Sequence, residues 1–237
     1  MLKIKIESPS CETCQARISN VFCSLSDDQA HDMSIDKSCT FYTKGQLIFF
    51  EGNRPSGLYC INKGKVKLYQ IGTQGKEQIV RLAKESDILG YRSLISGENY
   101  NASATAIEDS MICYISKKTF FDLLQENSEL SSRVMQLLSH DLRTAETRIT
   151  GLAQKPVRER LAETLLTLKE FYGTEADNAT INATLTREDI ANIVGTATET
   201  AIRLLSELKG EKVIDLIGKK IKILNREKLI KIAQVYD

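Results

Sequence analysis

Six cysteines are the residues of this sequence with the most distinctive chemistry, and three of them fall within its first two dozen positions in a Cys-x2-Cys-x8-Cys spacing. They are Cys11, Cys14, Cys23, Cys39, Cys60 and Cys113. Thiolates are the preferred ligands of iron–sulfur clusters and of zinc, and a Cys-x2-Cys pair also suits a redox-active dithiol. In a reducing compartment we expect these cysteines to be free, metal-binding or redox-active, and not to form structural disulfides. With two histidines in the chain, a multi-histidine zinc site is not expected.

A second group of residues has the chemistry needed to read DNA bases. Glu199, Ile202, Arg203 and Ser206 stand at relative positions 0, 3, 4 and 7, so they share one face of a helix. Arginine donates two hydrogen bonds to guanine, and a carboxylate accepts one from the amino group of cytosine. The alternative is that Glu199 serves only the helix start and forms an ordinary i, i+4 ion pair with Arg203, worth roughly 0.3–0.5 kcal/mol.

The elements that must position this face follow from capping and turn residues. Thr186-Arg-Glu-Asp189 predicts a helix start, because its hydroxyl and carboxylate can satisfy backbone N–H groups left free there. Gly195 permits a sharp turn, and Thr196-Ala-Thr-Glu199 predicts a second capping box that opens a helix through Lys209. Two short helices in this arrangement are the helix-turn-helix pattern.

A hairpin with a basic tip follows this pattern. Residues 213–217 and 220–224 alternate as strands around Gly218-Lys219. From Arg203 to Lys231 there are nine Lys or Arg and four Asp or Glu residues, a local excess of positive charge. Phosphate contacts require such a patch, so recognition helix and hairpin together predict a winged helix.

The remainder of the chain has two other patterns. Between about residues 39 and 115, short apolar runs at 46–50, 57–61, 65–69 and 78–82 are separated by glycines, which indicates an antiparallel barrel, roll or sandwich. From Phe120 a long helical periodicity takes over, before a shorter amphipathic helix at 157–172. The apolar residues of the long helical stretch are Leu130, Val134, Leu137, Leu138, Leu142, Ala145, Ile149 and Leu152. We expect this long helix to have a partner helix in a dimer; the alternative is packing against its own domain.

Composition excludes several classes of protein. The 237 residues include 32 basic and 31 acidic side chains, so the overall charge indicates neither nucleic acid nor membrane. No run approaches the roughly 18 apolar residues of a spanning helix, and the start lacks a secretory signal, so we expect a cytoplasmic protein with no membrane partner. The phosphate-loop, Gly-x-Ser-x-Gly and His-Glu-x-x-His motifs do not occur, so we do not expect an enzyme.

The order of these parts, with Thr186-Arg-Glu-Asp-Ile190 and Glu199-Thr-Ala-Ile-Arg203, resembles the Crp–Fnr family of bacterial transcription regulators over essentially the whole chain. Lys44-Gly45-Gln46 and Gly64-Lys65-Val66-Lys67 are similar to the family's roll. The resemblance implies an α+β fold with an N-terminal antiparallel β-roll of the cyclic-nucleotide-binding type, a long dimerisation helix and a C-terminal winged helix-turn-helix. It divides the chain into a cysteine-bearing segment (1–25), a sensor roll (26–125), the dimerisation helix (126–155) and the DNA-binding domain (156–237).

The resemblance also implies a sequence-specific, homodimeric transcription regulator. Its two recognition helices would read a palindromic site in double-stranded DNA, with RNA polymerase as a further partner. Glu199 and Arg203 match the family's base-reading pair, whereas Ile202 stands where other members often carry a small or hydroxyl residue, and its alkyl group can contact a thymine methyl. The residues expected to contact DNA are Thr186, Arg187, Thr196, Thr198, Glu199, Ile202, Arg203, Ser206, Lys219 and Lys220.

The resemblance also bears on the signal that the roll senses. Gly90-Tyr91-Arg92-Ser93 corresponds to the stretch that holds ribose and phosphate in cyclic-nucleotide-binding members, but Tyr91 replaces the ribose carboxylate and the phosphate-binding arginine is absent. A cyclic phosphate would lack its usual charge partner, so cyclic-nucleotide binding is not expected; the alternative is that Arg92 supplies the charge from a different angle.

The cysteines match the Fnr-type oxygen sensors, in which four thiolates bind a [4Fe–4S] cluster. Cys113 occupies the position of the distant ligand, and the set implied is Cys11, Cys14, Cys23 and Cys113, with Cys39 as the alternative to Cys23. The other possibilities are zinc or a thiol–disulfide switch on these cysteines, and a regulator without a cluster that responds in the roll to a small molecule, such as haem-bound gas or a metabolite, or to thiol oxidation. Cys60 and Cys113 also suit buried apolar positions of strands.

Overall fold

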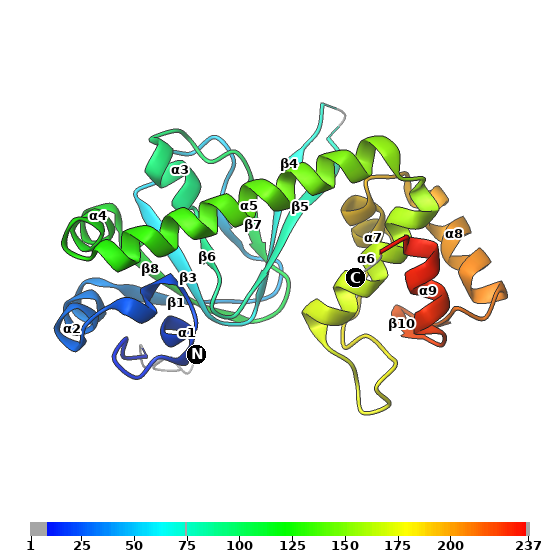
Figure 1. Cartoon of the computed structure of the whole chain (residues 1–237), viewed down its shortest axis with the longest axis horizontal. Coiled ribbons are helices and arrows are strands. Elements are labelled where there is room, and N and C mark those ends of the chain that lie inside the picture. The colour runs from blue at the N-terminus through cyan, green and yellow to red at the C-terminus, as the bar shows by residue number, and fades with distance from the viewer. Residues whose placement is uncertain (1–8, 74, 236–237) are drawn as a thin grey trace, which may run out of the picture. The chain divides into compact units, whose positions relative to one another are not determined.

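The computed structural model describes residues 9–73 and 75–235, and it divides the chain into two compact units (Figure 1). Within the described ranges, the first unit comprises residues up to 75 and 80–143, and the second comprises 76–79 and 144 onwards. The structure therefore has mixed helix and antiparallel sheet in its first part and mainly helix in its second, in agreement with the predicted α+β class.

Two four-stranded antiparallel sheets form the centre of the first unit, with strand orders β1-β8-β3-β6 and β2-β7-β4-β5. The strands are β1 (Ser38–Tyr42), β2 (Leu47–Phe49), β3 (Gly57–Lys63), β4 (Lys65–Ile71), β5 (Glu77–Lys84), β6 (Ile88–Leu89), β7 (Ser103–Ala106) and β8 (Ser110–Ser116). Phe49 and Leu68 from one sheet meet Ile61 and Ile112 from the other in one buried core. The four predicted apolar runs correspond to β2, β3, β4 and β5, and the roll is confirmed.

Short helices pack beside the roll, and most of them share a second buried core with it. They are α1 (Gln15–Ile18), the 3-10 helix η1 (Val21–Ser24), α2 (Asp27–Asp36), α3 (Tyr91–Ser96) and α4 (Lys117–Glu126). Phe22 and Phe120 meet edge to face, with ring centroids 6.3 Å apart, and Cys11, Leu58 and Leu130 belong to the same core. The cysteine-bearing N-terminal segment is thereby packed onto the roll.

The helical periodicity that starts at Phe120 comprises two helices, because Asn127 interrupts it, and the second corresponds to the long helix expected at 126–155. The side chain of Asn127 accepts a hydrogen bond from the backbone N–H of Leu130 at 2.9 Å and so caps α5 (Ser128–Gln154). The first half of α5 runs alongside the roll (Figure 1), and Leu130 and Val134 are buried there. Four later apolar residues are exposed, with 61%, 62%, 65% and 51% of their surface accessible: Met135, Leu142, Ile149 and Leu152.

The second unit has four further helices and a hairpin. They are α6 (Val157–Tyr172), α7 (Arg187–Val194), α8 (Thr198–Gly210), β9 (Ile214–Ile217), β10 (Lys220–Ile223) and α9 (Arg226–Ala233). Leu161, Ile190, Leu205, Ile221 and Leu229 are buried, one from each of the four helices and one from the hairpin. The helix α6 packs against α7, α8 and α9, and α8 packs against β9, so the helices and the hairpin are held together. The amphipathic helix at 157–172 and the hairpin are confirmed, while α9 was not predicted. No helix in the described part of the chain is long and apolar enough to span a membrane.

Candidate DNA-reading surface and cysteine cluster

The first helix of the predicted helix-turn-helix begins as expected. Thr186 accepts a hydrogen bond from the N–H of Asp189 at 3.0 Å, and the Asp189 carboxylate accepts one from the N–H of Thr186 at 3.1 Å. This reciprocal capping box satisfies two backbone donors that a helix start otherwise leaves free. Thr186 is thus used in capping, and its position at the first turn of α7 is set by local sequence.

The turn between α7 and α8 depends on a glycine and on an arginine that the sequence did not reveal. Gly195 has a φ of +73°, in the left-handed region that favours glycine. Arg160 on α6 donates to the carbonyls of Val194 and Gly195, at 3.2 Å each. A cation at the C-terminal end of a helix satisfies carbonyls that lack helical partners and complements the helix dipole. Arg160 is therefore a positioning residue for the second helix.

The second helix has one apolar side buried and one polar side exposed. Ala201, Leu204, Leu205 and Leu208 are buried in the unit's core. The opposite side carries Glu199, Ile202, Arg203 and Ser206, all exposed, so the structure brings the four predicted base-facing residues together on one face of α8.

The predicted start of α8 is wrong in detail. The residue that caps the helix is Ala197, whose side chain makes no cap hydrogen bond, so the capping box expected at Thr196 and Glu199 is not formed. Thr196 and Thr198 lie half-buried on either side of this residue. The carboxylate of Glu199 is therefore not engaged in a capping box.

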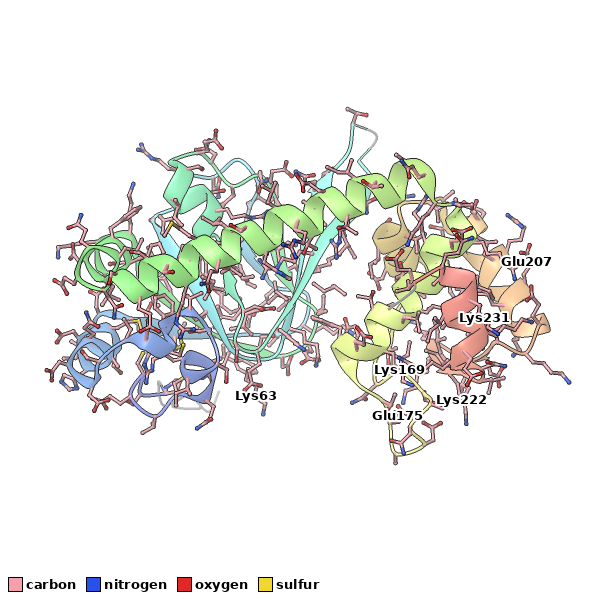
Figure 2. The ribbon with its side chains drawn as sticks, in the orientation of Figure 1. Lys63, Lys169, Glu175, Glu207, Lys222 and Lys231 are labelled. Carbon is pink, nitrogen blue, oxygen red and sulfur yellow. A yellow bond between two sulfur atoms is a disulfide. The ribbon has the colours of Figure 1, made fainter. Side chains whose placement is uncertain are left out.

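Two of the exposed polar groups on α8 have partners on the same helix. Arg203 forms an i, i+4 ion pair with Glu207, and not the alternative pair with Glu199 considered above. Figure 2 labels Glu207 on this helix. The hydroxyl of Ser206 donates to the carbonyl of Ile202 at 3.0 Å. The Arg203 side chain remains 64% exposed, and exposed i, i+4 pairs are worth only about 0.3–0.5 kcal/mol, so a base can compete for its guanidinium.

The hairpin is tied to α7 through Arg187. Its Nη2 donates to the carbonyl of Gly218, at the hairpin tip, at 3.1 Å, while its Nη1 is buried with no hydrogen-bond partner. Burial lowers the pKa of the Arg187 guanidinium. Arg187, which was predicted as a DNA contact, therefore holds the hairpin tip in place. Lys219, another predicted DNA contact, lies beside Gly218 and is exposed.

Several lysines of the basic segment lie in ion pairs. Lys222 meets Asp177 at 3.1 Å, Lys220 meets Glu175, and Lys209 meets Asp215 at 2.9 Å; Glu175 and Lys222 are labelled in Figure 2. A backbone hydrogen bond from Thr180 is the main cause that holds the pKa of Asp177 far below its usual range. Since Glu175 and Asp177 lie outside residues 203–231, the positive excess at the hairpin is smaller than the local sequence count.

One cysteine pair is joined, whereas we expected cysteines that are free, metal-binding or redox-active and not in structural disulfides. Cys39 on β1 and Cys113 on β8 form a disulfide across 74 residues of sequence. The two sulfurs can bond because β1 and β8 pair in a register that sets these two residues directly opposite each other. Cys113 has no thiolate to offer in this form, and the same holds for Cys39, the alternative ligand.

Four cysteines nevertheless line one pocket: Cys11, Cys14, Cys60 and Cys113. Phe22, Met33 and Ile115 add apolar walls, and the Sγ of Cys14 accepts a hydrogen bond from Asn62 at 3.3 Å. Burial raises the pKa of the Cys60 thiol. The donor set is thus rich in sulfur and poor in oxygen, which suits a soft metal.

Cys23 lies outside this group. It belongs to η1 and is not among the pocket's lining residues, so the structure gathers three of the four implied ligands and adds Cys60. Among the described residues, no three His, Cys, Asp or Glu side chains are arranged to hold a single metal ion. A cluster distributes its four cysteines over several iron atoms, so it needs sulfurs around a cavity and not around one point.

Tyr91, which replaces the ribose carboxylate, is buried. Its hydroxyl donates to the Asp141 carboxylate on α5, and Arg81 on β5 lies 3.5 Å from the same carboxylate. Burial, reinforced by the hydrogen bond to Asp141, raises the pKa of Tyr91. The side chain at this position thereby connects the roll to α5.

Comparisons with known proteins agree with this arrangement. Residues 39–127 match the model of the cyclic nucleotide-binding domain, and residues 159–232 match that of the Crp-like helix-turn-helix domain. These domains define a DNA-binding transcription regulator.

The chain is 33% identical over 193 residues to the fumarate and nitrate reduction regulatory protein of Vibrio cholerae, covering 81% of this chain and 77% of that protein. For the protein of that name in Escherichia coli, identity is 32% over 191 residues, covering 80% and 76%. The chain therefore belongs to the Crp–Fnr family of transcription regulators, and it is not an enzyme.

Solved structures share the fold. FixK2 from Bradyrhizobium japonicum superposes with a TM-score of 0.75 at 23% identity, covering 85% of this chain and 99% of that one. A crp/fnr-family regulator from Eubacterium rectale gives a TM-score of 0.76 at 19% identity, covering 91% and 98%.

The capping box leads to a first prediction. Thr186→Ala removes the hydroxyl that caps α7 and is expected to lower the free energy of unfolding by about 1 kcal/mol, measured by chemical denaturation. Thr184→Ala, which removes an exposed hydroxyl from the preceding loop, is the control and should leave stability unchanged. Equal losses in both variants would show that the box does not stabilise the helix start.

Proposed function

We propose that this regulator is a homodimer that reads a palindromic operator and responds to oxygen or redox state through a cysteine-bound [4Fe–4S] cluster. One observation carries the proposal: Cys11, Cys14 and Cys113 line a single apolar-walled pocket in a chain about one-third identical to proteins named for fumarate and nitrate reduction. RNA polymerase is the further partner proposed.

The exposed face of α8 supports base reading. Glu199 and Arg203 are one helical turn apart and exposed, with Ile202 between them at 46% exposure. In the major groove Arg203 can donate to guanine, Glu199 can accept from cytosine, and Ile202 can meet a thymine methyl. Thr186, Thr196, Thr198, Ser206, Lys219 and Lys220 are proposed as supporting contacts, with Arg187 holding the hairpin tip.

The exposed side of α5 supports dimerisation. Met135, Leu142 and Ile149 follow one another at seven-residue steps, and Leu152 lies three residues beyond the last. This is the spacing of a coiled-coil seam, and large apolar side chains exposed in such a row favour a second copy of the same helix. Leu130 and Val134 on the same helix are buried against the roll. We therefore propose that α5 packs against its own domain on one side and meets a second copy on the other.

The pocket supports a sulfur-ligated cluster once the Cys39–Cys113 disulfide is reduced. Cys11, Cys14 and Cys113, which line the pocket, are three of the proposed ligands. The fourth is Cys23, which lies outside the pocket lining and is proposed from the resemblance alone. When bound, the cluster supplies an oxygen-sensitive iron centre. The chain's own part is to hold the N-terminal segment against β3 and β8. Loss of the ligand bonds would release a segment that shares a buried core with α5.

An alternative is a regulator without a cluster that responds to thiol oxidation or to a small molecule in the roll. The observation that favours it is the disulfide, which already places one cysteine pair in its oxidised form. Visible absorption of anaerobically purified protein separates the candidates: a broad band that bleaches in air indicates the cluster, a sharp Soret band indicates haem, and a colourless protein favours thiols or a metabolite.

Removing the Arg203 guanidinium tests the recognition helix. In Arg203→Ala, discrimination between an operator selected from random DNA and a scrambled duplex is expected to fall by about 1–3 kcal/mol, measured by fluorescence anisotropy. Arg226→Ala removes one positive charge outside α8 and should weaken both duplexes alike. Unchanged discrimination in Arg203→Ala would exclude this helix as the reader.

The dimer interface is tested by placing a charge in the exposed apolar row. Leu142→Glu is expected to convert the dimer to a monomer in analytical ultracentrifugation, because two carboxylates would be buried opposite each other. Gln136→Glu adds the same charge at an exposed position outside the row and should remain dimeric. A dimeric Leu142→Glu protein would contradict the proposed seam.

The ligand set is tested by iron content after anaerobic reconstitution. Cys11→Ser, Cys14→Ser, Cys23→Ser and Cys113→Ser are each expected to lose iron and visible absorption, whereas Cys60→Ser should retain both. Iron retained in Cys23→Ser but lost in Cys60→Ser would put Cys60 in place of Cys23. Retention in Cys113→Ser would exclude the distant ligand.

A further inference from the structure

Three cysteines lie in one row across the first sheet. Cys39 on β1 pairs in register with Cys113 on β8, and Cys113 pairs in register with Cys60 on β3. Residues directly opposite in antiparallel strands point to the same face of a sheet, so all three sulfurs lie on one side. Cys113 occupies the middle of the row.

The same side of the sheet carries the N-terminal cysteines. Cys113 and Cys60 line the pocket together with Cys11 and Cys14, and α1 packs against β3 there. The sulfur of Cys113 can therefore form either of two bonds. One is the disulfide with Cys39, at the edge of the sheet, and the other is a bond to a metal in the pocket.

We propose that Cys39 competes with the metal centre for Cys113, so that Cys39–Cys113 is a reversible disulfide switch that controls cluster assembly. A metal ligand must be a thiolate, and a disulfide sulfur is not one, so the two states exclude each other. The inference rests on the proposed function and adds a second, thiol-based control of the same site.

The oxidation step balances with a small-molecule disulfide as co-reactant. The thiolate of one cysteine attacks a sulfur of the small disulfide, forming a mixed disulfide and releasing one thiol. The second cysteine then attacks its partner's sulfur, forming Cys39–Cys113 and releasing the second thiol. The protein loses two electrons and two protons to the small molecule, and reduction by excess thiol reverses both steps.

Strand position explains why Cys39 is the competitor. It lies on β1, an edge strand, and is partly exposed, so a small molecule can approach it. Cys60, the other neighbour of Cys113, lies on an inner strand between β8 and β6 and keeps its thiol in the structure.

Thiol counting under denaturing conditions tests the disulfide. After treatment of the purified full chain with glutathione disulfide and removal of the excess, wild type is expected to show four reactive thiols of six, and six after dithiothreitol. Cys60→Ser, the matched control, should show two fewer thiols before reduction than after it. Cys39→Ser should show the same number of reactive thiols before and after dithiothreitol, because it cannot form the disulfide. Six reactive thiols in treated wild type would overturn the proposed switch.

Iron uptake tests the competition. Treated protein is incubated anaerobically first with ferrous iron alone, because sulfide itself cleaves disulfides, and sulfide is added only together with dithiothreitol. Cys39→Ser is expected to take up iron at once, and wild type only after dithiothreitol, followed by visible absorption and iron content. Equal uptake by both before reduction would overturn the competition. No uptake by either after reduction would instead exclude the cluster, and the competition with it, whatever the thiol count shows.

Discussion

The apolar side of α8 is the constraint on which the DNA-reading half of this regulator depends. The apolar residues of this side, Ala201, Leu204, Leu205 and Leu208, are buried in the core of the second unit. Helical periodicity then directs Ile202, Arg203 and Ser206 away from that core, toward solvent. Gly195 and Arg160 determine where that helix begins relative to α7. The orientation of the face proposed to read DNA thus follows from hydrophobic burial and from a few polar contacts at one turn.

The helix α5 shows how one element serves two surfaces. Its early apolar residues, Leu130 and Val134, are part of the roll's core, and Asp141 receives the hydroxyl of the buried Tyr91. Its later apolar residues, among them Leu142 and Ile149, are exposed. A change in the packing of the roll would therefore act directly on the helix proposed to join two subunits.

What the sequence could predict was local. The capping box at Thr186, the turn at Gly195 and the shared face of α8 each depend on residues a few positions apart. The Cys39–Cys113 disulfide and the contacts of Arg160 join segments 74 and about 35 residues apart, and such pairs depend on strand register and helix packing that a single sequence does not reveal. The start of α8 was also mispredicted: hydroxyls at 196 and 198 flank the capping position, which is occupied by Ala197.

The carboxylates beside the hairpin have a thermodynamic consequence. Glu175 and Asp177 already neutralise Lys220 and Lys222, as bound counterions would, but they are covalently part of the protein. A nucleic-acid phosphate that approaches these lysines must displace a tethered anion, which does not enter the bulk solvent. Such an exchange yields little of the mixing entropy that usually favours polyelectrolyte association, so the ionic-strength dependence of binding should be shallower than the lysine content suggests.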